Sequence, residues 1–369
     1  MNPAAKVGDP VDAIDTPALV VDLDAMERNL ARMAEFARER HVRLRPHAKM
    51  HKCAAIAKLQ MAAGAVGVCV QKLSEAEALA AQGVGDIFIS NEVVAEAKLA
   101  RLAALAQRVR LGVAVDSMHG VDRLAAAMKA AGSMVDVFVE VDVGQGRCGV
   151  APAAAGALAQ QVVSHGLRFA GVQAYHGRAQ HLRGAAEREA AVRHAVAAAR
   201  AAQAAITANG VACPLVTGGG TGTFSFDAAS GVYGELQPGS YLFMDVDYAA
   251  NEPAPHAPVF EQALFVKSQV VSRGQSHAVV DAGHKSHAID SGLPRVWGRD
   301  LEFANGGDEH GILRARADAP PGIGSTVWLV PGHCDPTVNL HDHLIALRGG
   351  LVQGVVEAVW AVDARGCLS

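Results

Sequence analysis

Short apolar runs alternate with longer helical stretches between residue 24 and about residue 245. The helical stretches repeat their apolar positions every three or four residues, and the short runs are rich in Val, Ile and Phe. This alternation is typical of βα units around a parallel sheet, an α/β fold. Eight strands predict a closed (β/α)8 barrel of the TIM type, because no dinucleotide fingerprint of an open sheet is evident. The predicted strands are residues 42–48, 66–71, 86–90, 110–117, 135–144, 169–175, 214–218 and 235–244.

After about Ala250 the helical periodicity ends, and the pattern becomes that of antiparallel strands. The pair Gly349 and Gly350 predicts a two-residue hairpin, and the run 17–23 before the first barrel helix could pair with this second domain. We therefore expect a barrel of residues 17–250 and a β domain formed by residues 1–16 and 251–369. The strands expected in the β domain are residues 263–273, 277–283, 325–331, 342–348 and 351–362.

Composition narrows the class of protein. The chain has 369 residues, half of them hydrophobic, and a net charge of −4, which indicates a globular protein with room for two domains. No run of Lys and Arg is long enough to follow a nucleic acid, and no apolar run is long enough to cross a membrane. The first residues lack the apolar core of a signal peptide, so we expect a cytoplasmic protein. The six cysteines show no CxxC spacing, which disfavours a disulfide framework or a structural zinc cluster.

Glycine-rich segments follow the last two predicted strands. In TGGGTG, residues 217–222, backbone amides are free to face an anion, and Thr221 adds a hydroxyl. A tight turn without a ligand explains this segment alone equally well. Gly239 and Ser240 follow the adjacent strand, and barrels build phosphate sites after strands seven and eight. Together the two segments favour a bound phosphate group.

Lys49 follows the first predicted strand, among Arg45, His47, His51 and Lys52. Cationic neighbours or burial lower the proton affinity of a lysine and make it a nucleophilic amine, although a solvated basic turn is the commoner cause of such a cluster. A phosphate site and a lysine at the same barrel rim are what pyridoxal phosphate requires.

His333 and Asp335 follow the predicted strand 325–331. In an extended segment alternate residues share a face, so these two would face one way and Cys334 the other. Imidazole plus carboxylate suits Mn, Mg, Zn or Co. A surface turn is the commoner explanation of so short a motif, and two protein ligands would leave a metal ion open to water or substrate.

Several long motifs resemble one family. The segments RPHAKMHK, VGVCVQKLSEAE, VDVGQGRCGV, QAYHG, TGGGTGTFSFDAASGVYGELQPGSY and VPGHCDPTVNLHD together resemble the metal-activated D-threonine aldolases. These belong to the fold-type III pyridoxal-phosphate group, with alanine racemase and D-serine dehydratase. The resemblance extends from Asp15 to Gly366 and implies the barrel and β domain predicted above. It also implies cleavage of D-threonine and related β-hydroxy-D-amino acids to glycine and an aldehyde.

The resemblance assigns roles to individual residues. Lys49 would form the Schiff base with the cofactor, and His333 and Asp335 would bind the metal, with Mn foremost and Mg, Co or Zn as alternatives. In the related D-serine dehydratases the same site resembles His-x-Cys. Here the third residue is Asp335, which favours the aldolase branch. Asp308 and His310 would lie near the substrate. The implied contacts to pyridoxal phosphate are Lys49, Gln71, Arg147, Tyr175, Thr221, Gly239, Ser240 and Tyr248.

Breaking the bond between Cα and Cβ requires removal of the β-hydroxyl proton, and a divalent cation acidifies a bound alcohol. His181 is the candidate base, although a loop histidine that positions Gln180 would leave the same sequence. The alternatives are a D-serine or 3-hydroxy-D-aspartate dehydratase, a 3-hydroxy-D-aspartate aldolase, a racemase, and a noncatalytic pyridoxal-phosphate protein. The metal motif argues against the last two. Barrels of this type commonly dimerise, so we expect a homodimer with a small-molecule substrate and neither nucleic acid nor membrane as a partner.

Overall fold

Eight parallel strands form the sheet predicted for the first part of the chain, in the order β2-β9-β8-β7-β6-β5-β4-β3. This computed structural model describes residues 3–369. The amide of Cys69 donates to the carbonyl of Pro46 at 2.8 Å, and that of Ala48 donates to the carbonyl of Cys69 at 2.7 Å. These bonds join the segment after β2 to β3 and bring the two ends of the sheet together, so the predicted barrel is confirmed. The strands are β2 (Arg43–Leu44), β3 (Val68–Val70), β4 (Asp86–Glu92), β5 (Arg110–Val115), β6 (Asp136–Glu140), β7 (Arg168–Ala174), β8 (Val216–Gly218) and β9 (Glu235–Leu236).

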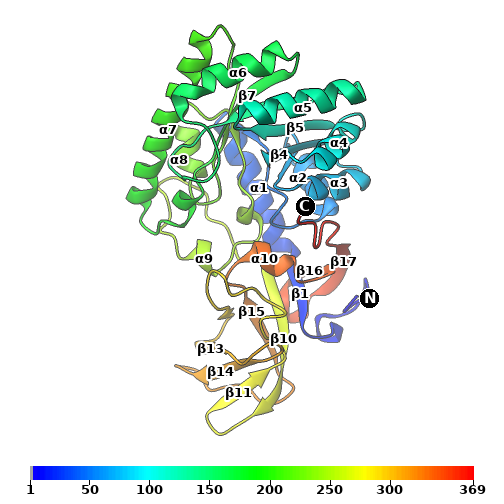
Figure 1. Ribbon diagram of the computed structural model, residues 1–369. Helices are drawn as coiled ribbons and strands as arrows, with labels where there is room; N and C mark the ends of the chain where they lie inside the picture. Colours follow the sequence, from blue (N-terminus) through cyan, green and yellow to red (C-terminus); the bar gives the residue numbers. More distant parts are fainter. Residues whose placement is uncertain (1–2) are drawn as a thin grey trace.

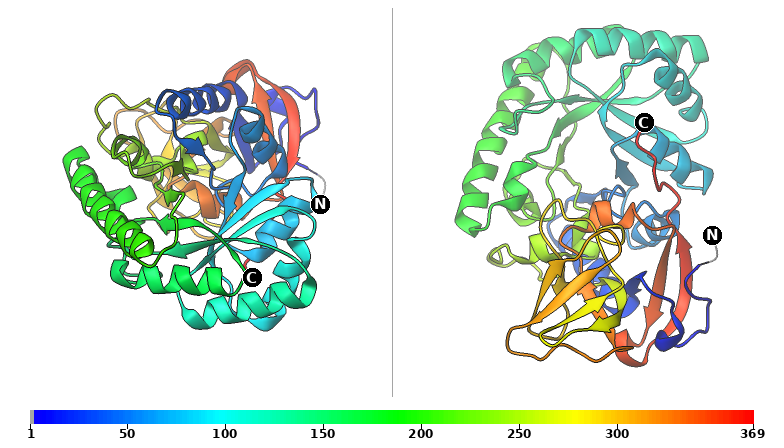
Figure 2. Two further views of the ribbon diagram at one scale, coloured as in Figure 1. Left: turned by 90° about the horizontal axis from the view of Figure 1, so that it is seen from above. Right: turned by 60° about the horizontal axis from the view of Figure 1, so that its bottom comes forward.

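Helices cover the outside of the barrel strands (Figures 1 and 2). Helix α1 begins where the side chain of Asp22 accepts a hydrogen bond from the amide of Ala25 at 3.1 Å, as an N-cap does. Helix α5 ends at Gly132, whose φ of 62° is the left-handed conformation that glycine adopts readily. The helices are α1 (Leu23–Glu39), α2 (Ala54–Ala62), α3 (Leu73–Ala81), α4 (Glu96–Leu105), α5 (Met118–Ala131), α6 (Ala155–Ser164), α7 (Ala185–Ala208) and α8 (Phe224–Ala229).

Shorter helices lie in the connections. They are η1 (Val11–Ala13), η2 (Pro152–Ala154), η3 (Arg178–His181), η4 (Ser240–Leu242), α9 (Val246–Ala249), α10 (Cys334–Val338) and α11 (Gly350–Gln353). Of the helices that the structure describes, none is long and apolar enough to cross a bilayer.

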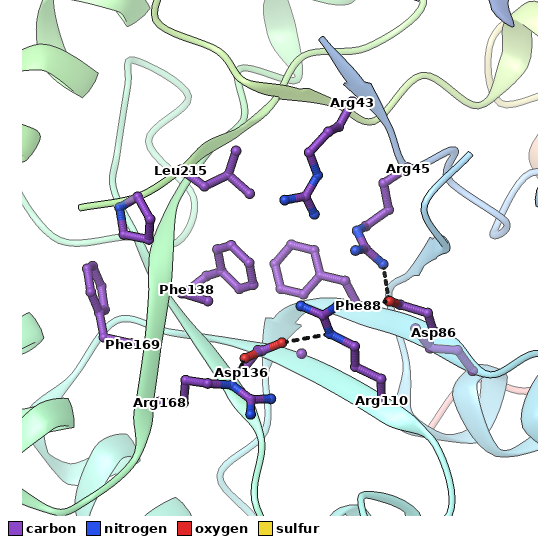
Figure 3. Close-up of a pocket in the computed structure, with 14 residues that line it drawn as sticks. Arg43, Arg45, Asp86, Phe88, Arg110, Asp136, Phe138, Arg168, Phe169 and Leu215 are labelled. Atoms are coloured by element: carbon purple, nitrogen blue, oxygen red, sulfur yellow. Dashed lines mark hydrogen bonds and ion pairs between the residues drawn. The ribbon is translucent and has the colours of Figure 1, made fainter. Parts of the chain in front are cut away.

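The amino-terminal end of the barrel holds a ring of ion pairs above an aromatic floor (Figure 3). Arg45 is buried and pairs with Asp86 at 2.5 Å and with Glu235 at 3.1 Å. Arg110 reaches Asp136 at 3.2 Å and so links neighbouring strands. The other two arginines that line this cavity of about 280 Å³ are also paired, Arg43 with Glu235 and Arg168 with Asp136. In barrels this end serves stability, so the functional site is to be sought at the opposite end.

The β domain is a nine-stranded sheet in the order β13-β14-β11-β10-β1-β16-β17, with β15 paired to β10 and β12. Most of its pairs are antiparallel, as predicted. Strands β12, β13 and β14 were not predicted, because each is short and has few apolar positions. In β13, for example, only Leu301 and Phe303 are buried. The strands are β1 (Ala18–Asp22), β10 (Leu264–Arg273), β11 (His277–Val280), β12 (Arg295–Val296), β13 (Leu301–Asn305), β14 (Gly311–Ala315), β15 (Thr326–Val330), β16 (His343–Arg348) and β17 (Val355–Ala361).

One expected turn of the β domain differs from the structure. Gly349 and Gly350 both have positive φ, but residues 349–354 connect β16 to β17, so the predicted two-residue hairpin is wrong. The reason is Leu351, which packs on the apolar cluster of the amino-terminal segment instead of extending β17. Strand β1 lies between β10 and β16, antiparallel to the first and parallel to the second. We therefore propose that the β domain includes residues up to 22 and not only up to 16.

Candidate active site

A cavity of about 430 Å³ opens at the carboxyl ends of the barrel strands. It brings together five of the residues predicted from the sequence, which are Lys49, Gln71, Arg147, Tyr175 and His181. The other residues that line it are His47, Ser90, Gln145, Gln173, Gly177, Arg178 and Gln237. Barrel enzymes place their catalytic groups at this end, so we take the cavity as the candidate active site.

Lys49 lies between β2 and α2, and its Nζ is 3.3 Å from Oδ2 of Asp335. This contact joins the barrel cavity to the metal motif of the β domain. The carboxylate of Asp335 raises the pKa of Lys49 and outweighs the burial that lowers it. The expected lowering by cationic neighbours is therefore wrong. Arg45 points to the other end of the barrel, and Lys52 pairs with Glu75 at 3.3 Å.

Buried His47 organises the wall beside Lys49. Its Nδ1 accepts the backbone N–H of Lys49 at 3.4 Å, and its Nε2 lies 3.2 Å from Oγ of Ser90. The side-chain Nε2 of Gln71 is 3.0 Å from Nε2 of His47. The backbone amide of Gln71 donates to Oε2 of Glu75 at 2.9 Å. Burial, followed by the charge of Lys49, holds the pKa of His47 well below its usual value. The imidazole is therefore neutral and acts as a fixed polar wall.

Arg147 and Tyr175 lie together on another side of the cavity. The guanidinium carbon of Arg147 is 5.9 Å from the centre of the Tyr175 ring, within the range of a cation–π contact. Burial raises the pKa of Tyr175, although Lys49 and Arg147 oppose this. The phenol therefore keeps its proton and can donate a hydrogen bond.

The two glycine-rich segments meet, as a phosphate site requires. The amide of Tyr241 donates to Oγ1 of Thr221 at 3.0 Å, which ties the loop after β8 to the loop after β9. A methyl group on Gly239 would come within 3.0 Å of the carbonyl of His47, so this segment lies against the one that carries Lys49. Five amides here donate to no acceptor within residues 3–369: those of Gly219, Gly220, Thr221, Gly239 and Ser240. Unclaimed amides and a hydroxyl beside a lysine fit the phosphate of pyridoxal phosphate.

The remaining predicted contacts are not all on the main cavity. Thr221 and Tyr248 line an adjacent cavity of about 320 Å³, while the ring of Tyr248 lies 5.4 Å from that of His181. Gln180 holds the glycine-rich loop, because its Oε1 accepts the amide of Gly222 at 2.9 Å and its Nε2 donates to Thr223. His181 instead contacts Asp247, with Nδ1 2.5 Å from Oδ2. His181 therefore does not position Gln180.

His333 and Asp335 lie close together in the metal motif. Nε2 of His333 is 3.9 Å from Oδ1 of Asp335, and its Nδ1 lies 2.7 Å from Oδ2 of Asp290. The carboxylate of Asp290 keeps a proton on Nδ1 and leaves Nε2 free toward Asp335, as second carboxylates do in metal sites. One nitrogen and one oxygen donor with this support fit a divalent cation.

The metal motif was expected to be extended, but it is extended only at His333. His333 has extended backbone angles but is the N-cap of α10, which begins at Cys334. Cys334 is buried on the other side, where its amide donates to Asp245 at 2.9 Å. The burial of Cys334 and this hydrogen bond hold the start of the helix in place.

Asp308 and His310 gain no support as substrate contacts within one chain. They lie in the turn between β13 and β14, which contacts Gly283 and His284 after β11, and neither residue lines the cavity that holds Lys49. Asp308 pairs there with His284 at 2.9 Å and with Lys285 at 3.2 Å.

The sequence matches two protein-family models. The family model of the alanine racemase N-terminal domain matches residues 21–247, and the family model of a putative serine dehydratase domain matches residues 263–347. A D-threonine aldolase from an Arthrobacter species is 49% identical, over 99% of this chain and 97% of that protein. A 3-hydroxy-D-aspartate aldolase from Paracoccus denitrificans is 43% identical, over 96% and 92%. The crystal structure of D-threonine aldolase from Filomicrobium marinum superposes with a TM-score of 0.97 at 49% identity and covers all of both chains. The chain therefore belongs to the D-threonine aldolase family, within the alanine racemase-like, fold-type III pyridoxal-phosphate enzymes.

Proposed function

We propose that this protein is a lyase that cleaves D-threonine and related β-hydroxy-D-amino acids to glycine and an aldehyde. It would use pyridoxal phosphate and a divalent metal ion. The observation that carries the proposal is the 3.3 Å contact between Nζ of Lys49 and Oδ2 of Asp335. It puts an amine able to bind the cofactor aldehyde beside a His–Asp pair able to bind the substrate hydroxyl through a metal.

Pyridoxal phosphate supplies an electron sink for the carbon–carbon bond that breaks. Lys49 would bind its aldehyde, while amides around Thr221, Gly239 and Ser240 would hold its phosphate. Gln71, Arg147, Tyr175 and Tyr248 would complete the walls, and the charge of Arg147 would balance that of bound anions.

His333 and Asp335 would hold the metal, with Mn foremost and Mg, Co or Zn as alternatives, because mixed nitrogen and oxygen donors suit all four. The metal supplies acidification of the substrate hydroxyl. Asp290 supports this role because its contact with Nδ1 orients His333. His181 lines the same cavity as Lys49 and would take the hydroxyl proton.

Arg178 favours a second candidate substrate, 3-hydroxy-D-aspartate. Its side chain is exposed and lines the cavity, and no acidic partner lies within salt-bridge distance of it in residues 3–369. A second substrate carboxylate would give it one. Replacing Arg178 with Ala should then lower kcat/KM for 3-hydroxy-D-aspartate by about tenfold or more and leave that for D-threonine within about threefold. Equal losses on both substrates would remove this candidate.

The proposal is tested by incubating the purified protein with pyridoxal phosphate and D-threonine, with Mn²⁺ or with EDTA. Acetaldehyde and glycine should form with Mn²⁺ and not with EDTA, and L-threonine serves as the control for stereochemistry. Formation of 2-ketobutyrate and ammonia would identify a dehydratase instead. We also propose a cytoplasmic homodimer, which sedimentation velocity and cell fractionation test.

A further inference from the structure

Helix α9 links the barrel to the metal motif. The side chain of Asp245 caps this helix by accepting the amide of Tyr248 at 2.8 Å, and it also accepts the amide of Cys334. The amide of Val246 donates to the carbonyl of Pro331 at 3.1 Å, and that of Asp247 donates to the carbonyl of Gly332 at 3.2 Å. These bonds fix α9 on the residues that precede His333, so the side chains of α9 have a defined position relative to the metal motif.

The two carboxylate oxygens of Asp247 have different donors. Oδ2 lies 2.5 Å from Nδ1 of His181, and Oδ1 accepts a hydrogen bond from Nη2 of Arg183. Nη1 of Arg183 is itself held by the carbonyl of Asp247 at 2.5 Å and by Oδ1 of Asn251 at 2.8 Å. The Asp247 side chain is only 8% exposed. Burial raises the pKa of this carboxyl, but Arg183 and then His181 outweigh it, so Asp247 is ionised.

This arrangement determines which nitrogen of His181 is free. A neutral imidazole carries one N–H, and an ionised carboxylate can only accept, so the proton of His181 resides on Nδ1. Nε2 then keeps its lone pair. The ring lines the cavity together with Lys49, Arg147, Tyr175 and Arg178. The geometry points to Asp247 as a positioning residue that keeps His181 ready to accept the β-hydroxyl proton at Nε2. This inference rests on the proposed function, and its test is designed so that either can fail alone.

The substitution Asp247→Asn keeps the shape and reverses one bond. Arg183 donates to the Oδ1 position, so the amide oxygen stays there and the amide NH₂ faces His181. Nδ1 must then accept, and the ring proton moves to Nε2, where it blocks proton uptake. We expect kcat for D-threonine to fall about 10²- to 10⁴-fold, the usual contribution of a general base. KM should stay within about threefold, because no group that binds the ground state is removed. The cofactor absorbance should not change.

A double-mutant cycle with His181→Gln separates positioning from a general structural role. If Asp247 acts through His181, adding Asp247→Asn to His181→Gln costs less than about twofold in kcat, whereas independent effects would multiply. The matched control is Asp122→Asn. It removes the carboxylate from a surface His–Asp pair, His165 and Asp122 at 2.9 Å on the outer helices, and should leave kcat unchanged.

If Asp247→Asn no longer binds the cofactor, the variant Arg183→Gln provides a second test of the inference. It leaves the carboxylate facing His181, so we expect a loss in kcat of less than about tenfold. A loss as large as that of His181→Gln would contradict the inference.

The readout that does not depend on turnover is ¹⁵N NMR of the holoenzyme labelled at histidine. His181 should carry its proton on Nδ1 in the natural protein and on Nε2 in Asp247→Asn. An unchanged tautomer, or full kcat in Asp247→Asn, would overturn the inference. If the tautomer shifts but the natural protein releases no acetaldehyde, the positioning role stands and the proposed function fails.

Discussion

Asp227 should make the stability of the protein depend on pH. Asp227 is 3% exposed in α8, behind the glycine-rich loop, and Oγ1 of Thr223 donates to its carboxyl at 2.6 Å. Burial raises the pKa of Asp227 to about 7 from an ordinary 3.8, although the bond from Thr223 opposes this. The folded protein therefore holds a proton on this carboxyl at pH values where the unfolded chain has lost it.

The direction and size of the effect follow from the two pKa values. Below about pH 4 both states hold the proton, and the stability linked to it is fully present. Between about pH 4 and pH 7 only the unfolded chain releases it, so the free energy of unfolding falls, by up to ~4 kcal/mol. Above about pH 7 both states are ionised and the loss is constant. Asp227→Asn cannot titrate, so its advantage over the natural protein should grow by up to this amount across that window.

Urea unfolding followed by circular dichroism, at steps from pH 4.5 to pH 8.5, measures the difference. Asp300→Asn, which changes an exposed carboxyl in the β domain, is the control and should show no such trend. A difference between Asp227→Asn and the natural protein that is the same at pH 5 and pH 8 would refute the assignment of a buried, protonated carboxyl.

Three further substitutions test the proposed site. Lys49→Ala should abolish turnover and the absorbance band of the lysine-bound cofactor together, and turnover that persists would remove Lys49 from its role. Asp335→Ala should spare that band while raising the Mn²⁺ concentration needed for half-maximal activity, and an unchanged requirement would contradict its role as a ligand. Asp290→Asn should weaken metal binding by about 10- to 100-fold without removing a ligand, as isothermal titration with Mn²⁺ measures.

Local patterns predicted the barrel strands and the residues at their carboxyl ends. Gln71 and Tyr175 each close an apolar run, so their place at the rim follows from strand length and direction alone. Arg45 misled the interpretation of Lys49, although it is only four residues away. A barrel strand spans the barrel from one end to the other, so the two side chains lie at opposite ends.

Residues that act through long-range contacts left no local signal. Asp247 meets His181 from 66 positions away, and Asp290 meets His333 from 43. Each is a single acidic residue in a short helix or a connection, and only the fold brings it to its histidine. The start of α10 at Cys334 was hidden for a similar reason, since Asp245 holds the helix from the other domain.

The central position of β1 in the β domain has a consequence for the biosynthesis of the protein. This strand leaves the ribosome before the barrel, but its neighbours on either side, β10 and β16, begin at residues 264 and 343. Until they emerge, a strand with both edges unpaired precedes a folding barrel, and such edges invite pairing with other chains. A fragment ending near residue 250 would carry that exposed strand permanently. Recombinant production of the barrel alone should therefore yield aggregates.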